Sequence, residues 1–442
     1  MEIKDYRQRV ADSVIAEVME GKGAVLVEGP KWCGKTTTCA HLARSVVAMD
    51  EPRRRERNVL LAKVDPDKLL EGEHPLLVDE WQIAPTLWDT VRYKVDHEKG
   101  FGHYLLTGSS VPPKTDEINH TGTGRIARVR MRPMSLWESG ESSGSVSLSR
   151  LFVGETFKTA EAHESSLEEI AFAACRGGWP AAIGLRERVA LRQAFDYVDA
   201  VVQSDISRFD GVARDPERAR RLMRSYARLQ GSAATWGVIA DDLSAHEGST
   251  FGENTAYAYL NALRGIFVVE DMPAWHPNLR RKTTIRTSDV RYFSDPSIVA
   301  ASLRIGPNDL MDDLSTFGLV FETMAVRDLR VYAEALDGDV FHFLDRNGLE
   351  CDAVVHLRDG RYGLVEVKIG GETLVEKGCA SLRRLRDALD TEKMREPSFM
   401  MVLTAVGDFA YRRPDDGVIV CPLGALRPWN LPEIPKLGNP ST

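Results

Sequence analysis

Residues 29–36 read Gly-Pro-Lys-Trp-Cys-Gly-Lys-Thr and follow directly after an apolar run, Ala24-Val25-Leu26-Val27-Glu28. They match the pattern Gly-x-x-x-x-Gly-Lys-Ser/Thr, a loop whose backbone N–H groups surround phosphate oxygens. The apolar run can form the strand that positions this loop. The residues after it can form a helix whose first turn adds N–H donors and a positive dipole. This order predicts a nucleotide-binding α/β fold; the alternative is a glycine-rich turn before an ordinary helix.

The loop predicts specific contacts to ATP and Mg²⁺. Lys35 is expected to reach the β- and γ-phosphates as a point charge, and the Thr36 hydroxyl is expected to bind Mg²⁺, which bridges the same phosphates. The full set of residues expected to contact the nucleotide from this loop is Gly29, Pro30, Lys31, Trp32, Cys33, Gly34, Lys35, Thr36 and Thr37.

A second apolar run, Leu76-Leu77-Val78, ends in the two acids Asp79 and Glu80. A buried parallel strand delivers carboxylates in this way to the carboxyl edge of a sheet. We expect Asp79 to hold Mg²⁺ through water and Glu80 to orient the water that attacks the γ-phosphate. The alternative is that the two acids begin a surface helix, which the loop about fifty residues upstream disfavours.

A third apolar run, Tyr104-Leu105-Leu106, ends in Thr107-Gly108-Ser109-Ser110. These hydroxyls would lie where a further strand of the sheet meets the nucleotide. Thr107 or Ser109 is therefore the candidate that senses the γ-phosphate. A Thr-Gly-Ser turn is common, so this assignment depends on its order and spacing relative to the two preceding motifs.

The composition is typical of a soluble multidomain protein. A chain of 442 residues is too long for one core, and 43% hydrophobic with 28% charged residues is an ordinary balance. The sequence shows neither a membrane span nor a secretory signal, and its six scattered cysteines indicate neither a disulfide framework nor a zinc site. We expect a cytoplasmic protein. The net charge of −8 argues against a uniformly basic nucleic-acid surface, although local clusters of arginine remain available.

The middle of the chain is expected to be helical. The Ser/Gly-rich stretch 140–149 suggests a surface loop or linker, and a helical pattern starts at Leu191. Residues 236–243, 254–263 and 266–269 then read as helix, helix and strand, the order of a winged helix-turn-helix. In a DNA-binding version the second helix would present Asn254, Thr255 and Tyr257, and the basic segment 280–282 would contact phosphates. The alternative is a module that serves only for packing.

The last third contains a second cluster of chemically active side chains. Glu366 and Lys368 lie two apart on a predicted strand, so they share a face, and Asp352 lies on a predicted neighbouring hairpin strand. This matches the PD-(D/E)xK pattern. Two carboxylates can hold Mg²⁺ or Mn²⁺ against a scissile phosphate while a lysine steadies the charge that develops. Exposed hairpins with salt-bridged ladders are the alternative.

The order of these motifs resembles the predicted prokaryotic AAA+ ATPases with a C-terminal domain of restriction-endonuclease type. The resemblance covers most of the chain and also rests on four further runs: Gly124-Arg125-Ile126 with Arg132-Pro133-Met134-Ser135-Leu136, Gly177-Gly178-Trp179-Pro180, Ser294-Asp295-Pro296 and Phe321-Glu322.

The resemblance implies roles for three more residues. Arg125 would approach the γ-phosphate of its own or a neighbouring subunit, unless it is a structural ion-pair residue. Glu322 would be a further acid of the nuclease-type site. Where this family usually has a small or polar residue the loop has Trp32-Cys33, which makes Cys33 a candidate for thiol reactivity.

We therefore expect an α/β protein of three parts: an AAA+ domain at 1–145, a helical region with a winged helix at 146–300, and a restriction-endonuclease-like domain at 301–442. The predicted activity is Mg-ATP hydrolysis with Glu80, Lys35 and Arg125, coupled to nucleic-acid binding, with DNA favoured over RNA. Metal-dependent cleavage would use Asp352, Glu366 and Lys368, with Glu322 as a further metal ligand. The alternatives are a nucleotide-gated switch or scaffold and a DNA-binding regulator without nuclease activity. AAA+ relatives often form rings, so a homo-oligomer is a further expectation.

Overall fold

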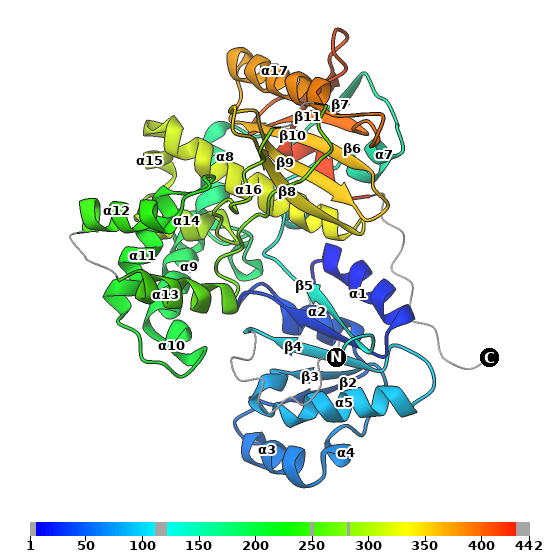
Figure 1. Cartoon of the computed structure of the whole chain (residues 1–442). Helices are drawn as coiled ribbons and strands as arrows, with labels where there is room; N and C mark the ends of the chain where they lie inside the picture. The colour runs from blue at the N-terminus through cyan, green and yellow to red at the C-terminus, as the bar shows by residue number, and fades with distance from the viewer. Residues whose placement is uncertain (1–5, 111–121, 248–251, 281–282, 430–442) are drawn as a thin grey trace.

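The computed structural model describes residues 6–110, 122–247, 252–280 and 283–429. Its N-terminal domain is built on a parallel sheet of five strands in the order β2-β3-β4-β1-β5, at the bottom of Figure 1. The strands are β1 (Ala24–Glu28), β2 (Ser45–Ala48), β3 (Leu76–Asp79), β4 (Tyr104–Gly108) and β5 (Ile126–Arg130). The predicted strands at 24, 76 and 104 are all present, and the strand order places β4 between β1 and β3.

Helices cover both faces of this sheet because the central strands are apolar on both sides. Val25 and Val27 of β1 face one core, which they share with α1 (Val10–Gly21) and α2 (Lys35–Leu42). Ala24 and Leu26 face a second core. That core is completed by helices on the other face, mainly α3 (Arg55–Val64) and α5 (Thr86–His97), with the short α4 (Pro66–Leu69).

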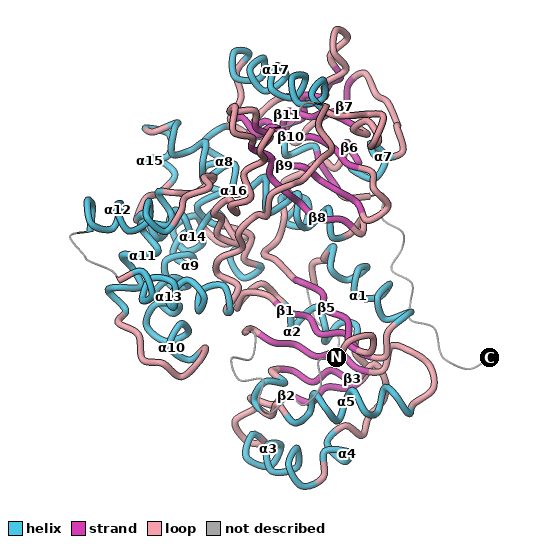
Figure 2. The backbone as a smooth tube through the Cα atoms, in the orientation of Figure 1, coloured by secondary structure: helices cyan, strands magenta, loops and turns pink. Residues whose placement is uncertain are grey.

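The middle of the chain is a helical region that lies to one side of the two sheets (Figures 1 and 2). Its main helices are α8 (Leu167–Arg176), α9 (Glu187–Ala200), α11 (Pro216–Arg228), α12 (Trp236–Glu247), α13 (Glu253–Gly265), α14 (Pro296–Leu303) and α15 (Pro307–Asp312). A turn of π-helix, η3 (Val201–Asp205), continues α9.

The two helices predicted near 236 and 254 are present as α12 and α13, but the strand predicted at 266–269 is not. Isolated bridges, Val269 with Phe293 and Met272 with Val290, replace it. Phe267 adopts a left-handed conformation with φ of 61°, which interrupts an extended strand at this point. The winged helix stays a prediction.

The C-terminal part contains a mixed sheet of seven strands in the order β7-β12-β13-β11-β10-β9-β8. Its central segment runs helix, three antiparallel strands, helix, parallel strand. These are α16 (Leu314–Glu334), β8 (Gly338–Leu344), β9 (Glu350–Leu357), β10 (Tyr362–Lys368), α17 (Glu372–Ala388) and β11 (Phe399–Thr404). Helices α16 and α17 pack on opposite faces, because alternate residues of β10 belong to two separate cores.

Two short strands follow residue 140 and pair with strands near the C-terminus. Strand β6 (Val146–Ser147) pairs with β14 (Leu426–Arg427), and β7 (Thr159–Glu161) pairs with β12 (Phe409–Arg412). Strand β7 thus belongs to the seven-stranded sheet, whereas β6 and β14 form a separate sheet of two strands. Strands of two and three residues are too short to show an alternation of polar and apolar residues, so no sequence pattern marks them.

Candidate functional site

The predicted phosphate-binding loop joins the carboxyl end of β1 to α2. Gly34 is the N-cap of α2 and has a φ of 101°, a conformation that favours glycine. A Cβ on Gly29 would lie 2.0 Å from the backbone oxygen of Met131, so only glycine fits there. The Lys35 ammonium is buried and donates to the carbonyl oxygens of Gly29 at 2.9 Å and Pro30 at 2.8 Å. The loop therefore holds its lysine inside the curve that a phosphate group would enter.

Three side chains from neighbouring elements meet beside Lys35. The Thr36 hydroxyl donates to Asp79 Oδ1 at 2.8 Å, and the Thr107 hydroxyl donates to the same oxygen. This brings together the ends of α2, β3 and β4, as the sequence predicted. One hydroxyl and one carboxylate are oxygen donors of the kind that Mg²⁺ prefers, so these residues fit that ion.

Glu80 follows β3 in a left-handed conformation with a φ of 54°. Its backbone N–H donates to the Thr107 hydroxyl at 3.3 Å, and its carboxylate accepts from Ser109 at 3.3 Å and from Gln82. Burial raises the pKa of Glu80 above its ordinary value. A carboxylate with a raised pKa, fixed by two donors, is suited to orient and deprotonate a water molecule.

A cavity of about 760 Å³ opens at this edge of the sheet. Lys35, Thr36, Thr37, Glu80 and Ser109 line one side of it. Further lining residues come from the N-terminal segment, from the stretch after β5 and from the helical region, namely Tyr6, Arg7, Arg9, Met134, Trp179, Pro180, Ala181 and Gln193. The sequence analysis did not place this second set at the nucleotide, although two of the runs that carry the family resemblance contain Met134, Trp179 and Pro180.

The loop also contacts the helical region directly. Lys31 Nζ forms an ion pair of 2.6 Å with Asp205 Oδ1 of η3, and the Trp32 ring lies edge-on to Tyr197 of α9 with centroids 5.5 Å apart. Trp32 points outward and is 47% exposed, whereas Cys33 is fully buried. Burial of the Cys33 side chain corrects the expectation that its thiol is reactive.

Arg125 does not lie at this cavity. It precedes β5 and therefore stands at the amino edge of the sheet, opposite the loop. Its Nε donates to Asp96 Oδ1 of α5 at 2.6 Å, which matches the structural ion-pair alternative. The expectation that Arg125 approaches the γ-phosphate bound by its own chain is therefore wrong. A role of Arg125 at the ATP of a neighbouring subunit stays a prediction.

Comparison with known protein families agrees with this geometry. A family model described as an AAA domain matches residues 21–139, which include the loop, the Asp79-Glu80 pair and Thr107. The N-terminal part is an AAA-type ATPase domain. Two further models, both described as domains of unknown function, match residues 167–309 (DUF8612) and 317–426 (DUF4143). No curated protein matches the chain.

Two solved structures show distant similarity to the chain. The Walker-type ATPase of Pyrococcus abyssi is 15% identical over 68% of this chain and 97% of its own, with a TM-score of 0.43. A signal transduction ATPase with numerous domains (STAND) and a tetratricopeptide repeat sensor, from Pyrococcus horikoshii, is 10% identical over 76% of this chain and 48% of its own, with a TM-score of 0.20. At TM-scores this low, no functional conclusion is drawn from either protein.

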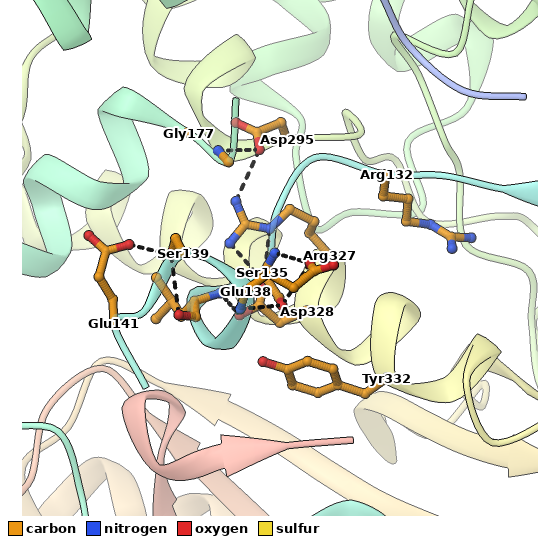
Figure 3. A network of polar contacts seen from close by, with 12 residues as sticks. Arg132, Ser135, Glu138, Ser139, Glu141, Gly177, Asp295, Arg327, Asp328 and Tyr332 are labelled. Atoms are coloured by element: carbon orange, nitrogen blue, oxygen red, sulfur yellow. Dashed lines mark hydrogen bonds and ion pairs between the residues drawn. The ribbon is translucent and has the colours of Figure 1, made fainter. Parts of the chain in front are cut away.

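A buried polar junction joins the ATPase domain to the other two parts (Figure 3). Asp295 Oδ2, at the start of α14, accepts from the Gly178 N–H and from Arg327 Nη1, both at 3.0 Å. Asp328 Oδ2 of α16 accepts from the Leu136 N–H at 2.9 Å. Burial raises the pKa of Asp328 to about 6.

Gly178 and the N-terminal cap of α6 allow the backbones to pack closely at this junction. A Cβ on Gly178 would lie 2.1 Å from the Met134 oxygen. Ser135 and Glu138 form a capping box for α6 (Leu136–Ser139), and Arg9 Nε donates to Glu138 Oε1 at 2.9 Å. The junction thus unites residues from three of the runs on which the family resemblance rests, and Met134 and Trp179 extend from it to the nucleotide cavity.

A second polar site lies where β9 and β10 separate. Their pairing ends at Ala353 with Val365, and beyond it Asp352 Oδ2 accepts from the Val367 N–H at 2.7 Å in place of a backbone oxygen. Lys368 Nζ lies 2.9 Å from Asp352 Oδ2 and 2.7 Å from Glu366 Oε2. The structure therefore brings together the three residues that the sequence predicted.

Glu322 of α16 belongs to the same site. Its carboxylate accepts from the Tyr292 hydroxyl, and burial, with the charge of Asp352 second, raises the pKa of Glu322 to about 8. The same two causes raise the pKa of Glu366 to about 8, and Glu366 Oε1 is buried without a hydrogen-bond partner among the described residues. The carboxylate oxygens of Glu322, Asp352 and Glu366, all among the described residues, do not form a group in which every oxygen lies within 4.8 Å of the other two.

Some of the residues predicted to contact DNA are exposed, and some of them contact other side chains. Asn254 and Tyr257 are exposed on α13, but Tyr257 lies edge-on to Trp236 of α12. Arg280 donates to the Thr391 hydroxyl at 3.2 Å, and residues 281–282 lie outside the described residues.

No helix in the described ranges is both long and apolar enough to span a membrane.

Proposed function

We propose that this protein hydrolyses Mg-ATP at the loop of residues 29–36 and that the bound nucleotide controls a metal-dependent phosphodiesterase site at Asp352, Glu366 and Lys368. The observation that carries the first half is the hydrogen-bonded chain from Thr36 through Asp79 and Thr107 to Glu80, which joins three elements at the edge of the phosphate-binding loop.

In the hydrolysis site each residue has one task. Lys35 leaves its two carbonyl acceptors and contacts the β- and γ-phosphates. Thr36 and Asp79 would hold Mg²⁺, and this ion would neutralise charge on the phosphate oxygens. Glu80 accepts the proton of the attacking water, and Ser109 and Gln82 keep its carboxylate in position. Trp179 and Gln193, from the helical region, close the cavity around the rest of the nucleotide.

The proposed control runs through helix α16. This helix contributes Arg327 and Asp328 to the junction and Glu322 to the carboxylate site. A shift of Met134 or Trp179 when ATP fills the cavity would move the junction, and a rigid helix would pass that movement to Glu322. The direct contact of Lys31 with Asp205 gives the nucleotide a second link to the helical region.

The carboxylate site is suited to phosphodiester chemistry. Asp352 and Glu366 offer oxygens to a divalent ion, and the unpartnered buried Oε1 of Glu366 is an atom that such an ion would satisfy. Lys368 would steady the negative charge that develops on the scissile phosphate. The family resemblance favours DNA as the substrate.

Two assays test the proposal. Phosphate release from ATP should require Lys35 and Glu80, and cleavage of DNA with Mg²⁺ or Mn²⁺ should require Asp352. If purified protein with either metal and ATP cuts neither DNA nor RNA, the nuclease half fails while the ATPase half stands.

A second candidate function is a nucleotide-gated switch that binds DNA or a protein without cutting it. One observation favours it: the Lys368 ammonium already contacts both Asp352 and Glu366, so the metal position is filled by a cation of the protein. DNA binding with a steep salt dependence that survives the Asp352→Ala change would support this candidate.

A homo-oligomer is part of the same proposal. Its support is that the Arg125 side chain is half exposed and lies away from its own nucleotide cavity. Equilibrium sedimentation with and without ATP tests whether the chain assembles.

A further inference from the structure

Two histidines and one glutamate converge at the amino edge of the ATPase sheet, the edge opposite the nucleotide cavity. His74 and His103 lie just before β3 and β4, and Glu98 is the C-cap of α5. Each residue contributes one nitrogen or oxygen atom that can bind a metal, and these three atoms all lie within 4.8 Å of one another. Among the described residues, 6–110, 122–247, 252–280 and 283–429, this is the only such group of three or more His, Cys, Asp or Glu side chains. Around a tetrahedral zinc ion the ligand atoms would be about 3.3 Å apart, so small side-chain rotations complete the approach.

The surrounding hydrogen bonds orient both imidazoles. His74 Nδ1 lies 2.8 Å from the backbone oxygen of His103. A proton on Nδ1 lets His74 donate this bond, and its Nε2 then carries the free lone pair. Metal-binding histidines are commonly fixed in this way, by donating the other ring N–H to a backbone carbonyl. His103 Nε2 is buried and has no hydrogen-bond partner among the described residues. A metal ion would give that nitrogen the partner it lacks.

The Glu98 carboxylate is also held in place by a hydrogen-bond donor. Both oxygens of Glu98 accept from the Tyr104 hydroxyl, at 3.1 and 3.2 Å. Burial, followed by the charge of Glu98, raises the pKa of Tyr104, so this hydroxyl stays protonated and donates. The nearest competing cation is Lys94, whose Nζ lies 3.7 Å from Glu98 Oε1 but only 3.1 Å from Asp67 Oδ1. Lys94 can therefore remain with Asp67 when a metal ion takes Glu98.

We propose that His74, Glu98 and His103 bind one Zn²⁺ ion, with water as a fourth ligand. Two imidazoles and one carboxylate suit Zn²⁺, whereas Mg²⁺ and Ca²⁺ prefer oxygen donors alone. The ion would tie the C-terminal end of α5 to the starts of β3 and β4. Its role is thus structural, and it is independent of the chemistry at Lys35 and Glu80.

The test uses the full-length protein after removal of metal with EDTA, titrated with Zn²⁺ in a buffer that contains excess Mg²⁺ to fill the nucleotide site and the carboxylate site at Asp352 and Glu366. Calorimetry should find one Zn²⁺ per chain, and the thermal unfolding temperature should rise as Zn²⁺ is added. The variants His103→Gln and Glu98→Gln should each bind Zn²⁺ at least about tenfold more weakly. His97→Gln is the matched control, because His97 lies next to Glu98 but its ring packs against Tyr93, with ring centroids 4.0 Å apart.

Two results would overturn the proposal: no stoichiometric binding of Zn²⁺ by the wild-type protein, or equal binding by the wild type and the Glu98→Gln variant. Glu98→Gln keeps an acceptor for Tyr104 and lies at a helix end, so its metal-free unfolding temperature should match that of the wild type. This comparison separates loss of a ligand from loss of the fold.

Discussion

Asp328 of α16 accepts a hydrogen bond of 2.9 Å from the backbone N–H of Leu136, at the first turn of α6. The bond is fully buried, and Asp328 also pairs with Arg327. A carboxylate is thereby placed at a helix N-terminus that comes from a segment 192 residues earlier in the chain. The same helix carries Glu322 of the second site. One rigid element thus touches both the end of the ATPase domain and the carboxylate–lysine cluster.

Replacement of Glu80 by glutamine should separate ATP binding from ATP hydrolysis. Glutamine keeps the shape and the contacts to Ser109 and Thr107, but it cannot accept a proton. Steady-state phosphate release should fall by about 10²- to 10⁴-fold, while the affinity for ATP changes little. Gln82→Ala is a useful control, since it removes a contact to Glu80 without removing the base, and should have a smaller effect. Hydrolysis at the wild-type rate by Glu80→Gln would exclude Glu80 as the base.

The ion pair between Lys31 and Asp205 should compete with nucleotide binding. Asp205→Asn removes the charge that holds Lys31 away from the phosphates, so ATP should bind several-fold more tightly. A fluorescent ATP analogue measures the dissociation constant. Asp199→Asn is the matched control, because Asp199 lies in the preceding helix α9 and also forms an ion pair, but with Arg220. Weaker binding by the Asp205 variant would mean that the contact stabilises the bound form.

A methyl group at Gly178 should destabilise the junction. Its Cβ would lie 2.1 Å from the backbone oxygen of Met134, which cannot rotate away. We expect Gly178→Ala to lower the free energy of unfolding by about 2 kcal/mol or more, as overpacking does. Gly21→Ala is the control, since a Cβ there meets nothing within 4 Å. Urea unfolding of both variants should show the loss only for Gly178.

The pH dependence of stability should reveal the buried carboxyl of Glu366. Its pKa is raised to about 8 in the folded protein, so between the ordinary range of glutamate and pH 8 the folded state binds a proton that the unfolded state has released. Stability must therefore fall as the pH rises through this window. In EDTA, Glu366→Gln should remove that part of the slope between pH 6 and pH 8.5. Identical slopes for wild type and variant in urea unfolding would show that Glu366 titrates normally.

The parts that the sequence predicted correctly are those whose chemistry lies within a few consecutive residues. The loop of residues 29–36, the Asp79-Glu80 pair and Thr107 each lie at or just after the carboxyl end of a buried strand, and parallel strands bring these ends to one edge. The same rule could have excluded Arg125, because a residue before a strand lies at the opposite edge. It also accounts for the meeting of His74 and His103, which both precede strands.

Long-range partners could not be predicted in this way. Arg9, Trp179 and Asp205 reach the nucleotide cavity or its loop from three separate segments, and no periodic pattern marks them. The carboxylate site was found because Glu366 and Lys368 share one strand face. Lys368 contacts both Asp352 and Glu366 because β9 and β10 separate just beyond Ala353 and Val365. The position of this separation is set by packing and not by the number of residues between the side chains in the sequence.

Phosphate release and DNA cleavage, measured side by side for the wild type, Lys35→Ala and Asp352→Ala, test most directly whether the nucleotide site controls cleavage. The assays use Mg²⁺ or Mn²⁺, with or without ATP. We expect the wild type to perform both reactions, Lys35→Ala to lose both, and Asp352→Ala to keep ATP hydrolysis and lose cleavage. Cleavage by Lys35→Ala at the wild-type rate, with or without ATP, would contradict the proposed control of one site by the other.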